Sequence, residues 1–284
     1  MKKTLILIMV LTIFFLTSCN RLSELKSDMT PEKWLNSHPH FNVSIGSLKF
    51  IFAEPSSSFF VFSLGIILLI IGILILKKYK GEKTVLFWSL AFIVWAISTF
   101  SAGVSYQAFS YEIKCAGRSV CLWTSWWEII YLFLFVMAVN LIIIAVSFSS
   151  SKGKFRKLII GYALSNFIVY STLLFKGAFL PDKFLVSFEF MVLFSGPTFV
   201  ILLITNLISY KIRKEKLDLL LVFEWLFMFF IVILYFCFYI SKIPEILWAK
   251  GIWFNANDLL HITLILWVLF FYFKVSRYLK DLKN

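Results

Sequence analysis

The sequence carries little charge. Only 15% of its 284 residues are Asp, Glu, Lys or Arg, whereas 61% are hydrophobic, and the mean hydropathy is +0.89. This composition excludes an ordinary soluble domain and is typical of a polytopic membrane protein. The bilayer is then the solvent for most side chains, and the helices must satisfy their own backbone groups.

Cysteine, histidine and cofactor motifs are also scarce. The four cysteines and three histidines form no CxxC pair and no zinc-finger spacing, which excludes a structural zinc site of that kind. The chain has no P-loop, dinucleotide fingerprint, nucleophile elbow or haem motif, so we expect no nucleotide and no redox cofactor. The net charge of +13 is sorted by topology, as shown below, so it does not require nucleic acid as a partner.

The N-terminal residues read as a secretory signal. A basic start precedes an apolar run over residues 5–16, and Leu16-Thr17-Ser18 then precedes Cys19. This pattern resembles a bacterial lipoprotein signal, which implies a signal peptide over 1–18 and lipidation of Cys19. An uncleaved first transmembrane helix ending at Cys19 is the alternative, and both place residue 20 onward outside the cytoplasm. Residues 19–58 are expected to form a short extracytoplasmic lead-in, with a helix starting at Pro31 and capped by Thr30.

Seven apolar runs follow, each near the roughly 20 residues that a spanning helix needs. They predict an all-α membrane bundle over residues 59–273 and a cytoplasmic tail over 274–284. The runs are Phe59 to Leu76, Val85 to Tyr106, Trp126 to Phe148, Leu158 to Phe175, Phe184 to Tyr210, Leu217 to Ile240, and Ala256 to Phe273.

Basic residues predict the orientation. Alternate loops at 77–83, 152–157, 211–216 and 274–283 each hold four, which is 16 of the 28 in the chain. The positive-inside rule places these loops in the cytoplasm and the N-terminus outside. The expected location is therefore a bacterial cytoplasmic membrane, with the C-terminus inside.

Two cysteines fall in a predicted outer loop. Cys115 and Cys121 are six residues apart, and an oxidising compartment permits a disulfide between them. Two unrelated thiols are the alternative. Cys237, within the sixth run, is expected to be a small buried residue.

Polar residues of the predicted spans gather at the outer level, which predicts one outward-facing polar pocket. On a helix, Asn257 and His261 share a face and Asp258 lies three residues before His261. Structural roles stay open for all of them: Asn257 as a helix cap, Asp258 near the helix dipole, His261 as an interfacial residue. Glu224 lies nearer the inner side and is expected to reach the interface near Lys216. The outer residues are Ser101, Ser105, Tyr106, Glu128, Asn257, Asp258 and His261.

These features together resemble the CREST superfamily of seven-helix membrane proteins. The resemblance rests on the number of helices, the outward N-terminus, a Ser-rich small-residue face on the second run, and the string Asn255-x-Asn257-Asp258-x-x-His261. That superfamily includes alkaline ceramidases, the adiponectin and progestin receptors, and bacterial relatives, which this string resembles most. The resemblance covers residues 59–273.

The resemblance implies a zinc hydrolase site, which this chain matches only in part. Zinc would be held by a histidine ending the second helix and by His-x-x-x-His in the seventh. His261 matches one histidine, Asn257 stands in place of another, and Ser101 and Ser105, or Tyr106, fall where Ser-x-x-x-His is expected. Asp258 or Glu128 would be the acidic partner. Zinc held by His261, Asp258 and Glu128 is chemically allowed, and it would polarise an amide carbonyl and activate water.

Two functions follow as expectations. In the first, the pocket binds or hydrolyses a lipid-like amide or ester at the outer leaflet, with Asp258 or Glu128 as general base, His261 as ligand or proton carrier, and Ser101 nearby. In the second, the protein is a non-catalytic receptor or assembly protein in which the same groups hold a ligand or the helices. A transporter has less support, because no inverted repeat or charged path is visible. The sequence predicts membrane lipid as a partner and identifies no protein partner.

Overall fold

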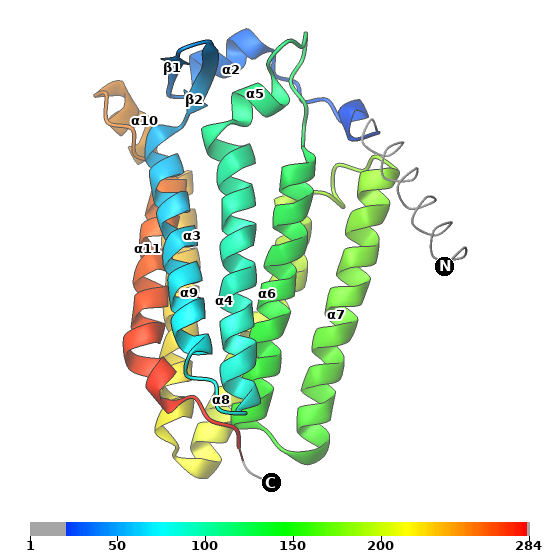
Figure 1. The fold of residues 1–284 in the computed structure, drawn as a ribbon, viewed down its shortest axis with the longest axis vertical. Helices are drawn as coiled ribbons and strands as arrows, with labels where there is room; N and C mark the ends of the chain where they lie inside the picture. Colours follow the sequence, from blue (N-terminus) through cyan, green and yellow to red (C-terminus); the bar gives the residue numbers. More distant parts are fainter. Residues whose placement is uncertain (1–20, 283–284) are drawn as a thin grey trace.

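The structure is a computed structural model that describes residues 21–282. Within this range, seven helices are long and apolar enough to cross a bilayer, which confirms the predicted all-α membrane bundle (Figure 1). The protein is therefore a multi-pass integral membrane protein. The signal segment and Cys19 lie outside the described residues. The spanning helices are α3 (Pro55–Leu76), α4 (Lys83–Ala102) with the π-helical turn η2 (Gly103–Ala108), α6 (Trp126–Ser150), α7 (Gly153–Phe179), α8 (Phe188–Arg213), α9 (Lys216–Ile240), and α11 (Ala256–Phe270) with η3 (Phe271–Val275) and the 3-10 turn η4 (Ser276–Tyr278).

Helix α4 lies at the centre of the bundle, between α3 and α6. Its small residues are buried as their spacing predicted, with Ala91 and Ser98 at 0% exposure. Glycines of α3 allow the close approach: a Cβ on Gly65 would lie 2.7 Å from the ring of Phe100, and one on Gly72 would lie 3.2 Å from a backbone oxygen of α4. Because lipid tails are as apolar as the side chains, such close packing is what holds membrane helices together.

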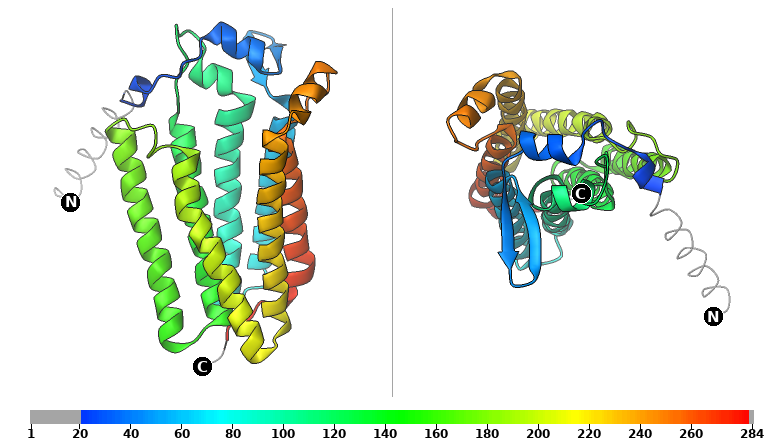
Figure 2. Two further views of the ribbon diagram at one scale, coloured as in Figure 1. Left: turned by 180° about the vertical axis from the view of Figure 1, so that it is seen from behind. Right: turned by 90° about the horizontal axis from the view of Figure 1, so that it is seen from above.

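An aromatic cluster fills the half of the core nearer the basic loops, which is called the inner half after the predicted orientation. Trp88 and Phe92 of α4, Trp225 of α9, Trp267 of α11 and Phe271 of η3 are all fully buried. Their ring centroids lie 4.2 to 6.4 Å apart, which is the spacing of favourable aromatic pairs. Helix α8 crosses the bundle obliquely, from beside α7 at the outer end to beside α9 at the inner end. It is seen in front of the other helices in the left view of Figure 2.

The lead-in forms a small cap over the end of the bundle at which α3, α6 and α11 begin, which is called the outer end after the predicted orientation. It comprises the 3-10 turn η1 (Arg21–Glu24), α2 (Pro31–Ser37) and an antiparallel hairpin of β1 (His40–Ile45) and β2 (Leu48–Ala53). Thr30 caps α2 as predicted, accepting a hydrogen bond from the backbone N–H of Lys33 at 3.3 Å. The hairpin was not predicted. Seen from above, it projects beyond the ring of helices (Figure 2).

Two expectations about α9 are wrong. Cys237 is exposed on the outside of the bundle instead of buried. Glu224 does not reach the interface near Lys216: it is 0% exposed, and both of its carboxylate oxygens lack a hydrogen-bond partner in the described chain. Its side chain faces inward because it follows Leu217 and Leu221, which are buried on the same helix face.

Candidate functional site

The outer end of α11 begins with a capping box. The side chain of Asn255 accepts hydrogen bonds from the backbone N–H groups of Asn257 (2.8 Å) and Asp258 (3.1 Å), and Asp258 accepts one in return from the backbone N–H of Asn255 (2.9 Å). This reciprocal pattern satisfies the free donors of a helix start. The cap is therefore Asn255, not Asn257 as one interpretation held.

Asp258 also fastens α11 to the start of α3. Its carboxylate is buried and accepts hydrogen bonds from the hydroxyls of Ser57 (2.7 Å) and Ser56 (3.1 Å). Asn255 donates to the same Ser57 hydroxyl at 3.1 Å. With three donors around it, the carboxylate is engaged in holding two helices together.

His261 lies one turn further along α11 and is half-buried. Its Nδ1 lies 2.7 Å from the backbone carbonyl oxygen of Asn257. Since a carbonyl can only accept, Nδ1 carries the proton and Nε2 is left as an acceptor. A metal-bound histidine often has this arrangement, but the site must also supply the remaining ligands.

A second polar cluster surrounds the π-helical turn η2. Ser105, fully buried, donates to Glu128 Oε1 at 2.7 Å and lies 2.8 Å from the hydroxyl of Ser125, which caps α6. Lys114 Nζ pairs with the same Glu128 oxygen at 2.9 Å, and it lies 5.1 Å from the ring centre of Tyr106. The extra residue of a π-turn re-aims nearby side chains, and such turns are frequent at functional sites. Here the turn directs Ser105 towards α6.

Ser101 belongs to neither cluster. Its hydroxyl donates to the carbonyl oxygen of Ile97, one turn back on its own helix, at 3.1 Å. This bond is a common way for a membrane helix to satisfy a serine. Ser101 therefore makes no hydrogen bond to Glu128, Asp258 or His261.

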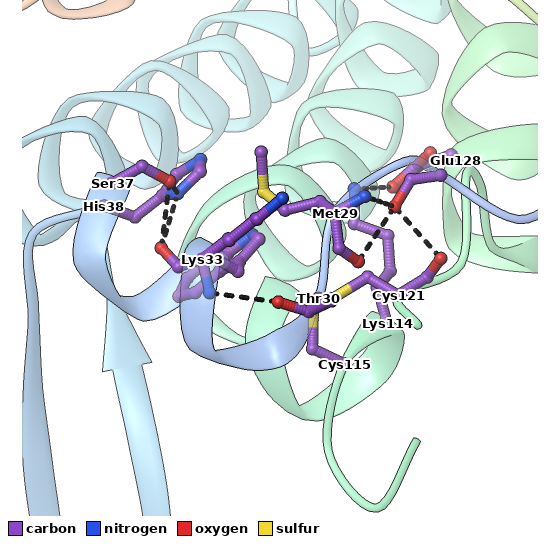
Figure 3. Close-up of a disulfide and its surroundings, with 11 residues drawn as sticks. Met29, Thr30, Lys33, Ser37, His38, Lys114, Cys115, Cys121 and Glu128 are labelled. Carbon is purple, nitrogen blue, oxygen red and sulfur yellow. Dashed lines mark hydrogen bonds and ion pairs between the residues drawn. A yellow bond between two sulfur atoms is a disulfide. The ribbon is translucent and has the colours of Figure 1, made fainter. Parts of the chain in front are cut away.

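The loop closed by the disulfide lies between the cap and this second cluster. Cys115 and Cys121 are bonded at the end of α5 (Ser110–Lys114), and Figure 3 shows Lys114 and Glu128 beside them. The backbone N–H of Cys121 donates to the carbonyl oxygen of Met29, which precedes α2, at 2.9 Å. The loop that the disulfide closes thus ties the lead-in to the outer end of the bundle.

Glu54 connects the cap with the first cluster and was missed by the sequence reasoning. It stands between β2 and α3 in the left-handed backbone region (φ 40°), which is uncommon for a residue with a side chain. Burial and the neighbouring Asp258 raise the pKa of Glu54 to about 7, and Lys114 opposes this shift. His38 Nε2 lies 4.0 Å from its carboxylate, and burial lowers the pKa of this histidine. The only sequence signal was an acidic residue directly before Pro55 and an apolar run.

The structure places the residues of the predicted pocket in two groups. Asp258 and His261 lie on α11 against α3, whereas Glu128, Ser105 and Tyr106 lie between η2 and α6, and each group has its own partners. In residues 21–282 no three His, Cys, Asp or Glu side chains are placed to hold a metal ion together. The donors present therefore do not fit the zinc site implied by the resemblance, so the expectation of zinc held by His261, Asp258 and Glu128 is not supported by this geometry.

Comparison with known proteins adds the family. The profile of a family of unknown function (DUF6962) matches residues 59–280. No curated protein and no solved structure matches the chain significantly. The matched region begins just inside α3 and ends after η4, so it covers all seven spans and leaves out the cap.

Proposed function

Because the chain belongs to a family of unknown function, DUF6962, we propose its role from its own residues: it is a non-catalytic receptor or assembly protein with a CREST-like helical shell. In this proposal the polar groups at the outer end hold helices and cap together. The cap binds a membrane lipid or a protein partner outside the cell. The hydrolytic function expected from the resemblance is the weaker alternative.

One observation carries this proposal: the polar groups expected to act in catalysis are already engaged in separate helix junctions. Asp258 has three hydrogen-bond donors on α3 and α11, and Glu128 has a lysine and a serine. A general base must lie within hydrogen-bond reach of the proton that it abstracts. The oxygens of Asp258 and Glu128 instead face donors of the fold itself, which favours a structural role for both carboxylates.

The orientation belongs to the same proposal. The basic loops at 77–83, 152–157 and 211–216 and the basic segment at 274–282 lie at one end of the antiparallel bundle, opposite the cap (Figure 1). The positive-inside rule then favours a cytoplasmic basic end and an external cap in a bacterial cytoplasmic membrane. A disulfide in the loop after α5, beside the cap, agrees with an oxidising exterior.

The hairpin is the part of the cap best placed to meet a partner. It projects beyond the helices (Figure 2), and the side chains at its tip, Ile45 and Leu48, are each 67% exposed. Apolar side chains held outside a bundle are typical of a surface that contacts lipid or another protein.

The test separates structural from catalytic roles. Purified protein is assayed against lipid amides and esters, beside Asp258→Asn, Glu128→Gln and the exposed control Glu245→Gln. The proposal predicts no turnover by any of them, and a lower unfolding temperature for Asp258→Asn than for the control. Turnover by wild type that disappears in a folded Asp258→Asn or Glu128→Gln protein would establish the hydrolase instead.

A further inference from the structure

Glu224 is a carboxyl group deep in the membrane. It lies eight residues after the start of α9 at Lys216, which is about 12 Å along the helix axis. It is 0% exposed. Neither carboxylate oxygen has a hydrogen-bond partner among residues 21–282. Buried polar groups without partners are rare in native proteins, and each one asks for an explanation.

The surroundings of Glu224 are aromatic. Its backbone carbonyl accepts a hydrogen bond from the indole N–H of Trp267 at 3.0 Å. The next residue, Trp225, stacks on Trp88 with ring centres 6.0 Å apart, and the indole N–H of Trp88 is also buried without a partner. This part of the core thus holds two polar side chains that the fold does not satisfy.

No charged group compensates Glu224. Helix α9 packs mainly against α8, α10 (Ile243–Ala249), α11 and η3, and it also meets α4 through the rings of Trp225 and Trp88 and α6 through the hydrogen bond from Ser150 to Asp218. No ion pair joins Glu224 to any of these elements within the described chain. Arg213 is engaged by Asp218. The Asp, Glu, His, Lys and Arg side chains on these elements are Lys83 of α4, Glu128 of α6, Glu189, Lys211 and Arg213 of α8, Glu245 of α10, Asp258 and His261 of α11, and Lys274 of η3.

Asp218 shows how the same helix treats a charged carboxylate. It too is 0% exposed, but it pairs with Arg213 and accepts hydrogen bonds from Ser150 (2.6 Å) and Asn206 (3.2 Å). An ion buried without such partners costs several kcal/mol, and more at membrane depth. Glu224 has none of them, so a neutral carboxylic acid is the form that the packing accommodates.

We propose that Glu224 is a proton-binding site in the membrane core, where the carboxyl group holds a proton while α9 packs against α11 and the aromatic cluster. The proposed ligand is a proton because, among residues 21–282, the carboxyl oxygens have no hydrogen-bond or ion-pair partner, and no three His, Cys, Asp or Glu side chains are placed to hold a metal ion. Ionisation would need a partner from elsewhere, so loss of the proton is coupled to rearrangement of these helices or entry of water.

A hydrophobic carbodiimide tests the proposal directly. Dicyclohexylcarbodiimide reacts with a protonated carboxyl: the proton goes to a carbodiimide nitrogen, the carboxyl oxygen bonds to its central carbon, and no atom leaves. Full-length protein in detergent at neutral pH is treated, digested and analysed by mass spectrometry. We expect modification of Glu224, no modification of Asp218, and loss of the label in Glu224→Gln.

Three outcomes would overturn the proposal. An unmodified Glu224 in the folded protein would show that it does not carry a proton within reach of the reagent. Equal modification of Asp218 would show that burial alone sets the reaction. Protection of Glu224 by sodium chloride but not by choline chloride would show that the group binds sodium ion. Each result is read on wild-type protein, so it does not depend on whether Glu224→Gln folds.

Discussion

Replacing Glu54 by glutamine will remove a pH dependence from the outer cap. The pKa of Glu54 is raised from 4.5 to about 7, first by burial and then by Asp258. The folded cap therefore keeps this proton up to about pH 7, whereas an opened cap releases it near pH 4.5. Stability from this group is fully present below pH 4.5 and is lost as pH rises through 7.

The size of the effect follows from the two pKa values. A carboxyl pKa moved from 4.5 to about 7 corresponds to about 3 kcal/mol, which is on the order of a few hundredfold in the opening equilibrium. Glutamine has the shape of the protonated acid and does not titrate. Glu54→Gln should therefore match wild type at low pH and become more stable than wild type above neutral pH.

Hydrogen exchange of the hairpin amides, residues 40–53, measures cap opening. The protection of Glu54→Gln relative to wild type is compared at each pH, which cancels the intrinsic change of exchange rate. Burial lowers the pKa of His38, so His38 contributes stability that is lost as pH falls, but it titrates in both proteins. A ratio that stays constant from pH 4.5 to pH 8 would refute the reasoning, because it would mean that Glu54 does not titrate with opening.

Three further sets of substitutions test the helix packing and the disulfide. Arg213→Met leaves Asp218 buried without its cation and should lower the free energy of unfolding by about 3–5 kcal/mol, seen as a lower unfolding temperature in detergent. Adding Asp218→Asn to Arg213→Met should recover part of that stability. Gly103→Ala places a methyl group 2.9 Å from side chains of α3 and should cost about 1–3 kcal/mol, whereas Gly161→Ala, which meets nothing within 4 Å, serves as control. The double substitution Cys115→Ser and Cys121→Ser should lower the stability of the cap by about 2–4 kcal/mol, measured as faster hydrogen exchange of the cap amides. Unchanged exchange would show that the disulfide does not stabilise the cap.

The seven spans were predictable because a helix that crosses a bilayer needs about 20 consecutive apolar residues, and hydropathy detects such runs directly. The predicted run at 126–148 and the observed α6 (Trp126–Ser150) start at the same residue, and the other spans agree within a few residues. The hairpin was not predictable by the same means. Its strands are only six residues long, and neither shows a regular alternation of buried and exposed positions, so they give neither a span-length apolar run nor the two-residue period of a half-buried strand.

The site was predicted less well because its contacts are distant in sequence. Asp258 was identified as an outer polar residue, but its partners Ser56 and Ser57 lie about 200 positions away, and no local pattern indicates that pairing. The π-helical turn at Gly103–Ala108 was also invisible, since hydropathy does not distinguish it from an α-helix. In that turn Ser105 donates a hydrogen bond to Glu128, whereas Ser101 donates to a carbonyl oxygen of its own helix. The two serines, predicted to line one pocket, therefore have different partners.

The central claim is that the outer polar residues join helices and do not form a metal site. Metal content of the detergent-purified protein, measured by mass spectrometry for wild type beside His261→Ala, tests it most directly. We expect no stoichiometric zinc in either protein. Near-stoichiometric zinc in wild type that disappears in His261→Ala would contradict this claim and would favour the metal-dependent hydrolase.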